Sequence, residues 1–353
     1  MLKKIKFFLR KIIFIIFYRD KKIFYGDYYN SLNFGHLIFW NLVRPGRLLT
    51  RIRYKRFLFP KKIKKDDINI YIDTKSLSKN EIIEIAAKKL KKYGTVVLNQ
   101  YFNEETLSKF ENEYKNYFNM LSYQPSNSPS ITATLPLSKT LADLWFDEII
   151  TSIIDKYIKR LPVARNYPCL ISVTPKHSVI EEDYLKNKTD FAYRWHVDHS
   201  TLIQPAIYFD DVTERGSHME VILGSHTYPN VANAGYLSDK YVSKNNLTIG
   251  KCVGKRGSVQ IHCGNVFHRF SAVQNTTRTW MKFEFSSGNN ILLDPQQIGR
   301  MLKNDFNLSS LDDRSRTILS SIFPLPLHTP PFDRGYTYNR KKRTFKPSKF
   351  KGI

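Results

Sequence analysis

The run Trp195-His196-Val197-Asp198 places an imidazole and a carboxylate two residues apart. On an extended strand, side chains two residues apart point to the same side, so His196 and Asp198 can share one metal ion. A complete site needs a further ligand, and the sequence contains nine histidines. His199 has the opposite parity to His196 and should point away. The spacing therefore predicts two ligands and leaves the third open.

Four later histidines are candidates for the third ligand. His218 and His226 flank a predicted strand at 219–223 and lie near turns. His262 and His268 are six residues apart, so one continuous strand would place them on the same face. The residues between them, 263–265, instead predict a turn. Spacing alone does not choose among the four.

Two histidines and one carboxylate leave three positions open on an octahedral iron, enough for a bidentate cosubstrate and dioxygen. Zinc hydrolases use similar ligands, but with one open position and a general base nearby. A cation for the far carboxylate of 2-oxoglutarate would separate the two classes. Arg278 lies ten residues after His268, and a guanidinium can bind a carboxylate through two hydrogen bonds.

These residues must be positioned by a strand-rich fold. A capping box at Ser78 and Glu81 predicts a helix that ends at Gly94, and Asn103 should cap a second helix. After about residue 166 the pattern changes to short strands separated by turns. We therefore expect an all-β core with flanking helices (α+β), arranged as a double-stranded β-helix of the jelly-roll, cupin-like type. The predicted strands are 95–98, 169–173, 202–209, 219–223, 258–262, 267–273 and 279–285.

From about residue 85 to residue 290, the chain resembles the phytanoyl-CoA dioxygenase family of Fe(II)/2-oxoglutarate-dependent oxygenases. The matching residues are, in order, 93–98, 103–105, His196-Val197-Asp198, 209–216, Gly224-Ser225-His226, 257–262, Phe267-His268 and 275–278. The His-x-Asp pattern alone has little specificity, but its order with the later segments is fairly specific.

The resemblance implies a site and an activity. It assigns His196, Asp198 and His268 as catalytic metal ligands for Fe(II), with His262 as a supporting neighbour. It implies that Arg278 binds the cosubstrate 2-oxoglutarate. Where the family often has a polar residue two places after the distal His, this chain has Phe270, so Ser271 is expected to supply that hydrogen bond. The implied enzyme is a non-haem iron hydroxylase that uses dioxygen and releases succinate and CO2.

The charge distribution predicts three regions. The chain has 56 Lys and Arg against 31 Asp and Glu, a formal net charge of +25. Residues 1–65 carry +16 and residues 335–353 carry +7, which leaves +2 for residues 66–334. We expect a basic, aromatic-rich segment at 1–65, the oxygenase domain at 66–290, and a helical extension with a basic tail at 291–353. A uniformly basic nucleic-acid-binding domain is excluded, and no specific nucleic acid partner is expected.

The predicted location is cytoplasmic. The three cysteines show no CxxC spacing, and no apolar run reaches the roughly 20 residues that a spanning helix needs. Residues 1–65 combine cations with apolar clusters such as Ile12–Tyr18, which suits peripheral contact with an anionic membrane. The alternative is a basic arm packed on the body. Membrane placement would favour a small-molecule or lipid-linked substrate, such as a lipid or lipid-linked sugar.

Two other functions fit parts of the sequence. A non-catalytic jelly-roll could bind anionic partners through its basic ends, and it would not need iron. A metal-dependent hydrolase would need the metal but would not consume 2-oxoglutarate.

The membrane prediction can be checked by sedimentation with vesicles. Full-length protein should pellet with anionic vesicles, less so as salt rises, because the attraction is electrostatic. A chain that starts at residue 66 should stay in the supernatant, and neutral vesicles serve as the control. Equal sedimentation of the two chains would refute membrane contact through residues 1–65.

Overall fold

A computed structural model of the chain describes the central part of the sequence and short pieces after it. The described residues are 63, 68–122, 130–159, 161–173, 194–198, 202–227, 236–237, 239–271, 276–286, 310–319, 336–339 and 344–347. The predictions for the basic segment 1–65 lie almost entirely outside these residues. Within them, no helix is long and apolar enough to cross a bilayer.

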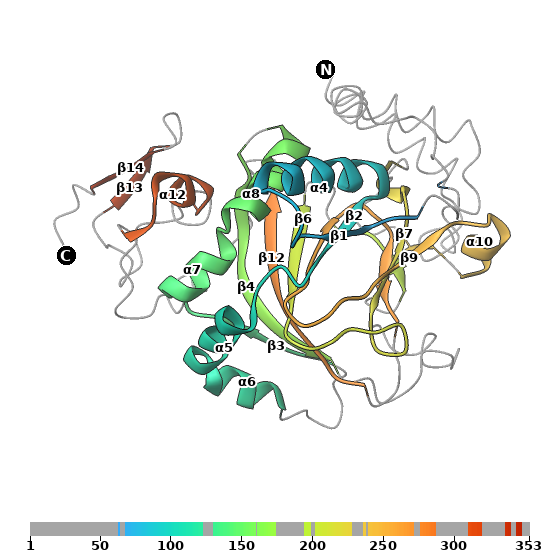
Figure 1. The fold of residues 1–353 in the computed structure, drawn as a ribbon, viewed down its shortest axis with the longest axis horizontal. Helices are drawn as coiled ribbons and strands as arrows, with labels where there is room; N and C mark the ends of the chain where they lie inside the picture. The colour runs from blue at the N-terminus through green and yellow to red at the C-terminus, as the bar shows by residue number, and fades with distance from the viewer. Residues whose placement is uncertain are drawn as a thin grey trace, which may run out of the picture.

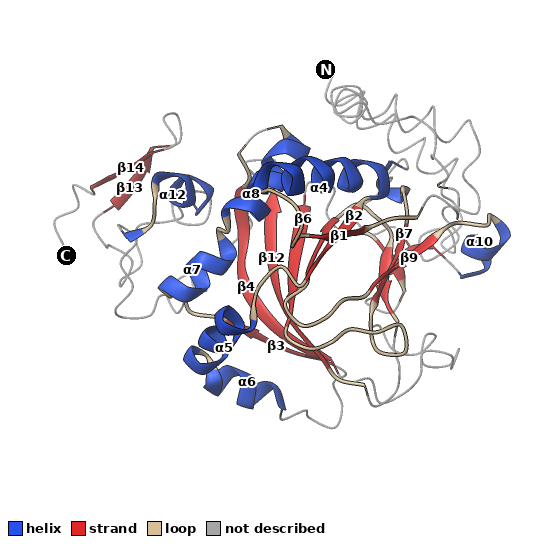
Figure 2. Ribbon diagram, viewed as in Figure 1, coloured by secondary structure: helices blue, strands red, loops and turns tan. Residues whose placement is uncertain are grey.

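Two β-sheets form the core of the molecule (Figures 1 and 2). The seven-stranded sheet has the order β1 (Tyr71–Asp73), β2 (Thr95–Asn99), β10 (Val259–Cys263), β6 (Leu202–Tyr208), β12 (Arg278–Ser286), β4 (Val163–Val173) and β3 (Ser130–Thr134). The five-stranded sheet has the order β8 (Tyr236–Leu237), β5 (Trp195–His196), β11 (His268–Phe270), β7 (Met219–Ile222) and β9 (Ile249–Cys252). Every pairing is antiparallel except that of β1 with β2.

The chain passes repeatedly between the two sheets. Strands β4, β6, β10 and β12 lie in the large sheet, while β5, β7 and β11 lie in the small one. This alternation is what winds a chain into a double-stranded β-helix rather than a meander of neighbouring strands. The predicted jelly-roll fold is confirmed.

Helices cover one face of the large sheet (Figure 1). The helices before β4 are α4 (Lys79–Tyr93), α5 (Glu104–Glu113), α6 (Lys115–Ser122), α7 (Lys139–Trp145) and α8 (Glu148–Ile158). The later elements are the short helices η5 (Ser225–Thr227), α10 (Asp239–Lys244) and α12 (Asp313–Leu319), and the hairpin β13 (Tyr336–Asn339) and β14 (Thr344–Pro347).

The predicted helix boundaries at Ser78, Gly94 and Asn103 are confirmed. Ser78 and Glu81 form a reciprocal capping box, and Asn103 caps α5. Gly94 ends α4 with φ of 83°, and a Cβ there would lie 2.6 Å from Nδ1 of His226. Glycine is required at this position by both the backbone conformation and the close approach.

Several boundaries differ from the sequence prediction. The helix capped by Asn103 ends at Glu113, and a separate helix begins at Lys115, so the helical stretch is divided at Tyr114. Strand β4 starts at Val163 and β11 stops at Phe270. The short strands β1, β3, β8 and β9 lacked a recognisable pattern, because short edge strands carry little periodicity.

The large sheet has two different faces. One row across it runs through Thr134, Cys169, Lys282, Ala206 and Gln260, each paired with the next on a neighbouring strand. Cross-strand partners face the same side, so this row lines the inside of the jelly-roll. The residues between them along the strands form the main apolar core under the helices; they include Leu170, Ile207, Ile261, Met281 and Phe283.

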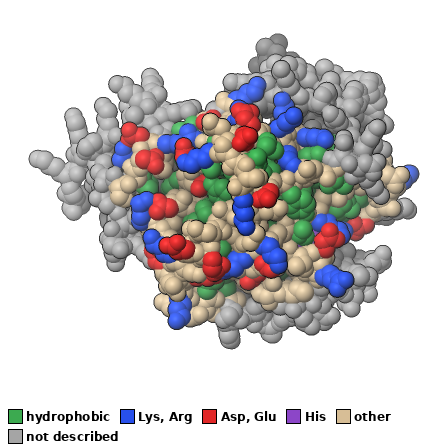
Figure 3. Space-filling model, in the orientation of Figure 1, with side chains coloured by type: hydrophobic (Ala, Val, Ile, Leu, Met, Phe, Trp, Pro, Cys, Tyr) green, Lys and Arg blue, Asp and Glu red, His purple; other side chains and the backbone are tan. Residues whose placement is uncertain are grey.

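The segment after residue 290 contributes to the same core. Leu311 and Ile318 of the α12 region are buried in the cluster that contains the helices over the large sheet. Arg314 of α12 lies 3.7 Å from the Asp155 carboxylate of α8. Helix α12 therefore packs against α8 and the core of the large sheet. The domain boundary predicted at residue 290 stays a prediction. Charges of both signs are interspersed over the described surface seen in Figure 3.

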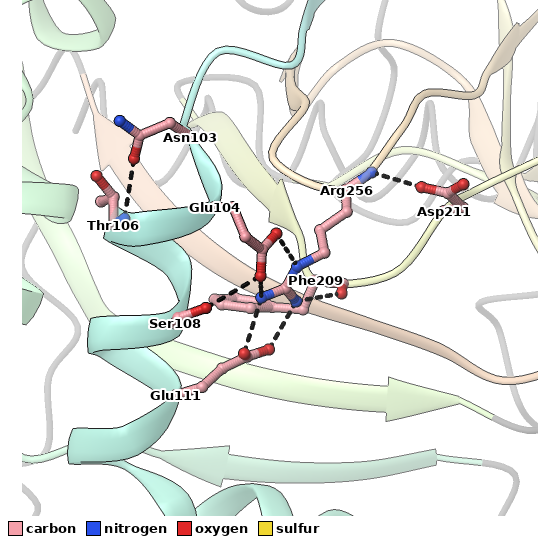
Figure 4. A network of polar contacts seen from close by, with 8 residues as sticks. All are labelled: Asn103, Glu104, Thr106, Ser108, Glu111, Phe209, Asp211 and Arg256. Atoms are coloured by element: carbon pink, nitrogen blue, oxygen red, sulfur yellow. Dashed lines mark hydrogen bonds and ion pairs between the residues drawn. The ribbon is translucent and has the colours of Figure 1, made fainter.

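A polar network joins α5 to the turn before β10 (Figure 4). The Arg256 guanidinium donates to the carboxylates of Glu104 and Glu111 at 2.7–3.0 Å, and to the Phe209 carbonyl at 2.7 Å. The backbone N–H of Arg256 donates to Asp211 at 2.9 Å. These contacts attach the α5 helix to the ends of β6 and β10.

Replacing Arg256 by Met should lower the free energy of unfolding by about 1–3 kcal/mol, because several charge-assisted hydrogen bonds are lost. Urea denaturation measures the change. Lys79→Met is a matched control, because Lys79 pairs with Glu148 at 3.1 Å with both side chains about 70% exposed. Such a surface pair contributes little. Equal stability of the two variants would contradict a structural role for the network.

Candidate metal centre

Strands β5 and β11 bring His196 and His268 face to face. The two strands pair antiparallel, and His196 is the direct cross-strand partner of His268. Their ring centroids are 4.3 Å apart. Asp198 follows β5 by two residues, and its Oδ2 lies 3.6 Å from Nε2 of His268. One ligand atom from each of the three residues lies within 4.8 Å of the others, so they can hold one metal ion.

Each histidine is oriented through its second ring nitrogen. Nδ1 of His196 lies 2.7 Å from the carbonyl of Arg194, and Nδ1 of His268 lies 2.9 Å from that of Val266. A carbonyl only accepts, so Nδ1 carries the proton in both rings. The lone pair is then on Nε2, as metal ligation requires. Both side chains are buried, which restricts ring rotation.

The electrostatics keep His196 and Asp198 in the forms that bind a cation. Burial and the neighbouring His268 lower the pKa of His196 to about 3. Burial alone would raise the pKa of Asp198, but His268 and Lys282 lower it to about 2. The amide of Gln204 on β6 also donates to Oδ2 of Asp198 at 2.5 Å. At neutral pH, Asp198 is a carboxylate and His196 a neutral imidazole, the forms that bind metal.

His262 lies beside this group but outside it. It sits on β10 in the large sheet, with its ring centroid 4.8 Å from that of His268. Burial holds the pKa of His262 well below its usual value, so its imidazole is neutral. The residues that could ligate one ion within the described part of the chain do not include it. Its placement is that of a neighbour of His268.

The other two candidates have structural contacts elsewhere. Nε2 of His226 lies 3.0 Å from the Lys91 carbonyl and so joins η5 to the end of α4. Nδ1 of His218 lies 2.9 Å from the Gly216 carbonyl, before β7 begins. Neither belongs to the group that could ligate a common ion.

The residues next to the two histidines interact on the opposite face of the small sheet. The Arg269 guanidinium stacks on the Trp195 ring, 4.3 Å from its centroid. Asp239 of α10 accepts hydrogen bonds from Trp195 Nε1 at 2.9 Å and from Arg269 at 2.7 Å. Glu220 on β7 accepts a further hydrogen bond from Nε of Arg269, at 2.7 Å. These contacts hold β5, β11 and β7 together immediately behind the ligands.

Arg278 begins β12 inside the jelly-roll and is 2% exposed. Its guanidinium carbon lies 4.7 Å from the Tyr208 ring centroid, 4.6 Å from that of Trp280 and 5.5 Å from that of Phe270. Among the described residues, none of its three side-chain nitrogens has a hydrogen-bond partner. A buried cation without a hydrogen-bonded counter-charge is costly, so this aromatic cradle suits an anionic ligand.

The structure places Phe270, rather than Ser271, directly against Arg278. The Ser271 backbone N–H donates to the His218 carbonyl at 2.8 Å, just beyond the end of β11. No contact between Ser271 and Arg278 is seen in the described part, so its role stays a prediction. Sequence reasoning missed Gln204 and Lys282, because their link to Asp198 depends on strand pairing.

No family model matches the sequence, and no curated protein matches it. Among solved structures, the chain is similar to the epimerase SnoN in complex with Fe3+, alpha ketoglutarate and nogalamycin RO (TM-score 0.46, 12% identity, 59% of this chain and 84% of that one). It is also similar to the non-heme alpha ketoglutarate dependent carbocyclase SnoK (TM-score 0.43, 14% identity, 68% and 93%). A further similar structure is AviO1 from Streptomyces viridochromogenes Tue57 (TM-score 0.42, 14% identity, 63% and 100%). These similarities are too weak to assign a function or a family, so the resemblance to phytanoyl-CoA dioxygenases stays a prediction.

Replacing His268 by Ala should lower the affinity for a divalent cation at least a hundredfold, because one of three ligands is lost. His262→Ala is the matched control and should change the affinity less than tenfold, since His262 is a neighbour and not a ligand. Anaerobic calorimetric titration with Fe(II) measures both. A larger effect from His262 would reverse the assignment.

Arg269→Met should weaken cation binding about ten- to a hundredfold, because the strands that carry the histidines lose their common clamp. Arg269→Lys should recover part of the affinity by keeping one ion pair. Arg256→Met controls for general destabilisation, since that network is remote from the ligands and should leave cation affinity unchanged. Unaltered affinity in Arg269→Met would show that the clamp does not position the site.

Proposed function

We propose that the protein is a non-haem Fe(II)- and 2-oxoglutarate-dependent dioxygenase that hydroxylates a small or amphiphilic substrate. The observation that carries the proposal is the buried guanidinium of Arg278, which has no hydrogen-bond partner among the described residues. It lies in the same jelly-roll interior as the His196, Asp198 and His268 group. Together they offer a cation site and a separate carboxylate site, which a dicarboxylate cosubstrate would need.

The donor set fits iron(II). Two imidazoles and one carboxylate would hold the ion through three ligand atoms and would leave room for a bidentate cosubstrate and dioxygen. Bound iron would supply the activation of dioxygen, coupled to the decarboxylation of 2-oxoglutarate. The chain's own contribution is to hold that ion through Nε2 of both histidines and a carboxylate oxygen of Asp198.

Arg278 would bind the far carboxylate of the cosubstrate. The guanidinium can donate two parallel hydrogen bonds to a carboxylate, and its aromatic surroundings exclude water and strengthen the interaction. Ser271 is proposed as a further hydrogen-bond donor near this end. Gln204 keeps Asp198 oriented while the other positions of the ion exchange ligands.

The alternatives explain less of the site. A hydrolase has no use for a buried guanidinium that is aimed into the same interior as the metal ligands. A non-catalytic jelly-roll that binds anionic partners through its basic ends would not need three converging ligands in their metal-binding forms. Peripheral membrane contact through residues 1–65 remains part of the proposal and would favour a lipid or lipid-linked substrate.

Arg278→Ala should raise the dissociation constant for 2-oxoglutarate at least a hundredfold, because two charge-assisted hydrogen bonds of about 1.5–3 kcal/mol each are lost. Affinity for Fe(II) should stay within a few-fold of the original. The absorption band of the anaerobic Fe(II)–2-oxoglutarate complex measures both in one titration.

Arg278→Lys should have a dissociation constant for 2-oxoglutarate between those of the original protein and Arg278→Ala, since an ammonium cannot donate both hydrogen bonds in the same geometry. If the original protein develops no such absorption band, or if Arg278→Ala binds 2-oxoglutarate unchanged, the proposed function is wrong.

A further inference from the structure

The interior of the jelly-roll also contains an ion pair that the proposed chemistry does not use. Lys282 and Glu284 lie two residues apart on β12, and their charged groups are 2.8 Å apart. Arg278, Trp280, Lys282 and Glu284 alternate along one strand, apart from an irregularity in pairing after Lys282, so they share its inward side. The pair therefore lies on the same strand and side as the proposed cosubstrate anchor.

Strand register places this pair beside the metal ligands. Lys282 is the cross-strand partner of Ala206 on β6, and Gln204, two residues before Ala206, donates to Asp198. Diagonal neighbours on one face of a sheet are about 7–8 Å apart, within reach of a lysine side chain. The Lys282 charge acts on His196, Asp198 and His262 alike.

This part of the interior is open, unlike the cradle around Arg278. Along β12 the exposed fraction is 2% at Arg278 and 3% at Trp280, but 31% for the Lys282 side chain. The Asp198 side chain is 25% exposed. Exposed side-chain surface is therefore found at Lys282 and at Asp198 of the metal-ligand group, which is where a substrate must approach.

Stability does not account for the pair. Partly buried ion pairs are often no more stabilising than apolar residues of similar volume, because both charges lose hydration. Burial opposes the ammonium, but Glu284 and Asp198 raise the pKa of Lys282, so it stays charged. Within the described residues, Glu284 is the one ion-pair partner recorded for Lys282, although an ammonium has three donors.

We propose that Lys282 and Glu284 together bind a hydroxyl group of an uncharged, polyhydroxylated substrate, such as a sugar ring, next to the metal site. A hydroxyl accepts a hydrogen bond from the ammonium and donates one to the carboxylate, so it can bind to both members of the pair at once. This inference deepens the proposed function and rests on it.

Charge balance favours a neutral substrate over an anionic one. Asp198 and Glu284 are negative, and Lys282 and Arg278 are positive. With Fe(II) and the 2-oxoglutarate dianion bound, the charges of these four described residues and the two ligands would cancel. An added carboxylate or phosphate would leave an uncompensated charge, which is costly in a low-dielectric interior.

Saturation-transfer NMR on the full-length protein, loaded with Zn(II) and 2-oxoglutarate, tests the proposal. The probes are methyl glycosides of glucose, galactose and mannose, their fully O-methylated forms, and glucuronate. At least one methyl glycoside should bind, its O-methylated form should not, and glucuronate should bind more weakly. Lys282→Met and Glu284→Gln should each weaken glycoside binding at least tenfold, because each removes one partner of the hydroxyl.

Lys251→Met is the matched control, since Lys251 forms an exposed pair with Glu214 at 2.7 Å and should bind glycosides normally. The inference is overturned if no methyl glycoside binds, if neither variant weakens binding, or if glucuronate binds best. If either Lys282→Met or Glu284→Gln fails to fold, the other variant still tests the inference. Repeating the NMR binding measurement without metal and cosubstrate separates this inference from the proposed function. If glycosides bind in a Lys282-dependent way but the protein develops no Fe(II)–2-oxoglutarate absorption band, only the proposed function is refuted.

Discussion

The antiparallel pairing of two very short strands is the interaction on which the site depends. Strand β5 has two residues and β11 has three, yet their register sets His196 directly opposite His268. A shift of one residue would turn one imidazole to the other side of the sheet. So short a pairing contributes few backbone hydrogen bonds, so contacts between side chains on the opposite face of the sheet must stabilise it. The stacked Trp195 and Arg269, tied to Asp239 and Glu220, fix the register from the far face of the sheet.

The large sheet supplies the other half of the interior and divides it into two environments. Toward the start of β12, aromatic rings enclose Arg278 and exclude water. Four residues further along the same side of β12, at Lys282, the strand presents a polar and more exposed side chain. Strand β12 thus presents a buried subsite for an anion at Arg278 and a more exposed polar subsite at Lys282. The metal-ligand group lies beside the second subsite. From Met281 to Phe285 the outward side of β12 is apolar, because helices cover it.

Charge is distributed to match this division. The three cysteines are free thiols, and burial raises the pKa of Cys169 and Cys252, so neither adds a negative charge to the interior. His262 and His196 are held neutral. Among the described residues, Asp198, Arg278, Lys282 and Glu284 bring formal charges to this part of the interior. Each of them has a proposed counterpart in metal, cosubstrate, substrate or one another.

Local sequence determined the features whose signals are local. Caps marked α4 and α5, short strand-like runs between turns marked several strands of the large sheet, and the parity of His196 and Asp198 placed two candidate ligands on one side. The third ligand was different, because spacing left four histidines open and only resemblance favoured His268. Tertiary structure decided that choice by strand register, which depends on contacts between residues 72 positions apart. It alone also revealed the unpartnered state of Arg278, the Gln204 contact and the Lys282–Glu284 pair, because each results from packing between strands that are distant in sequence.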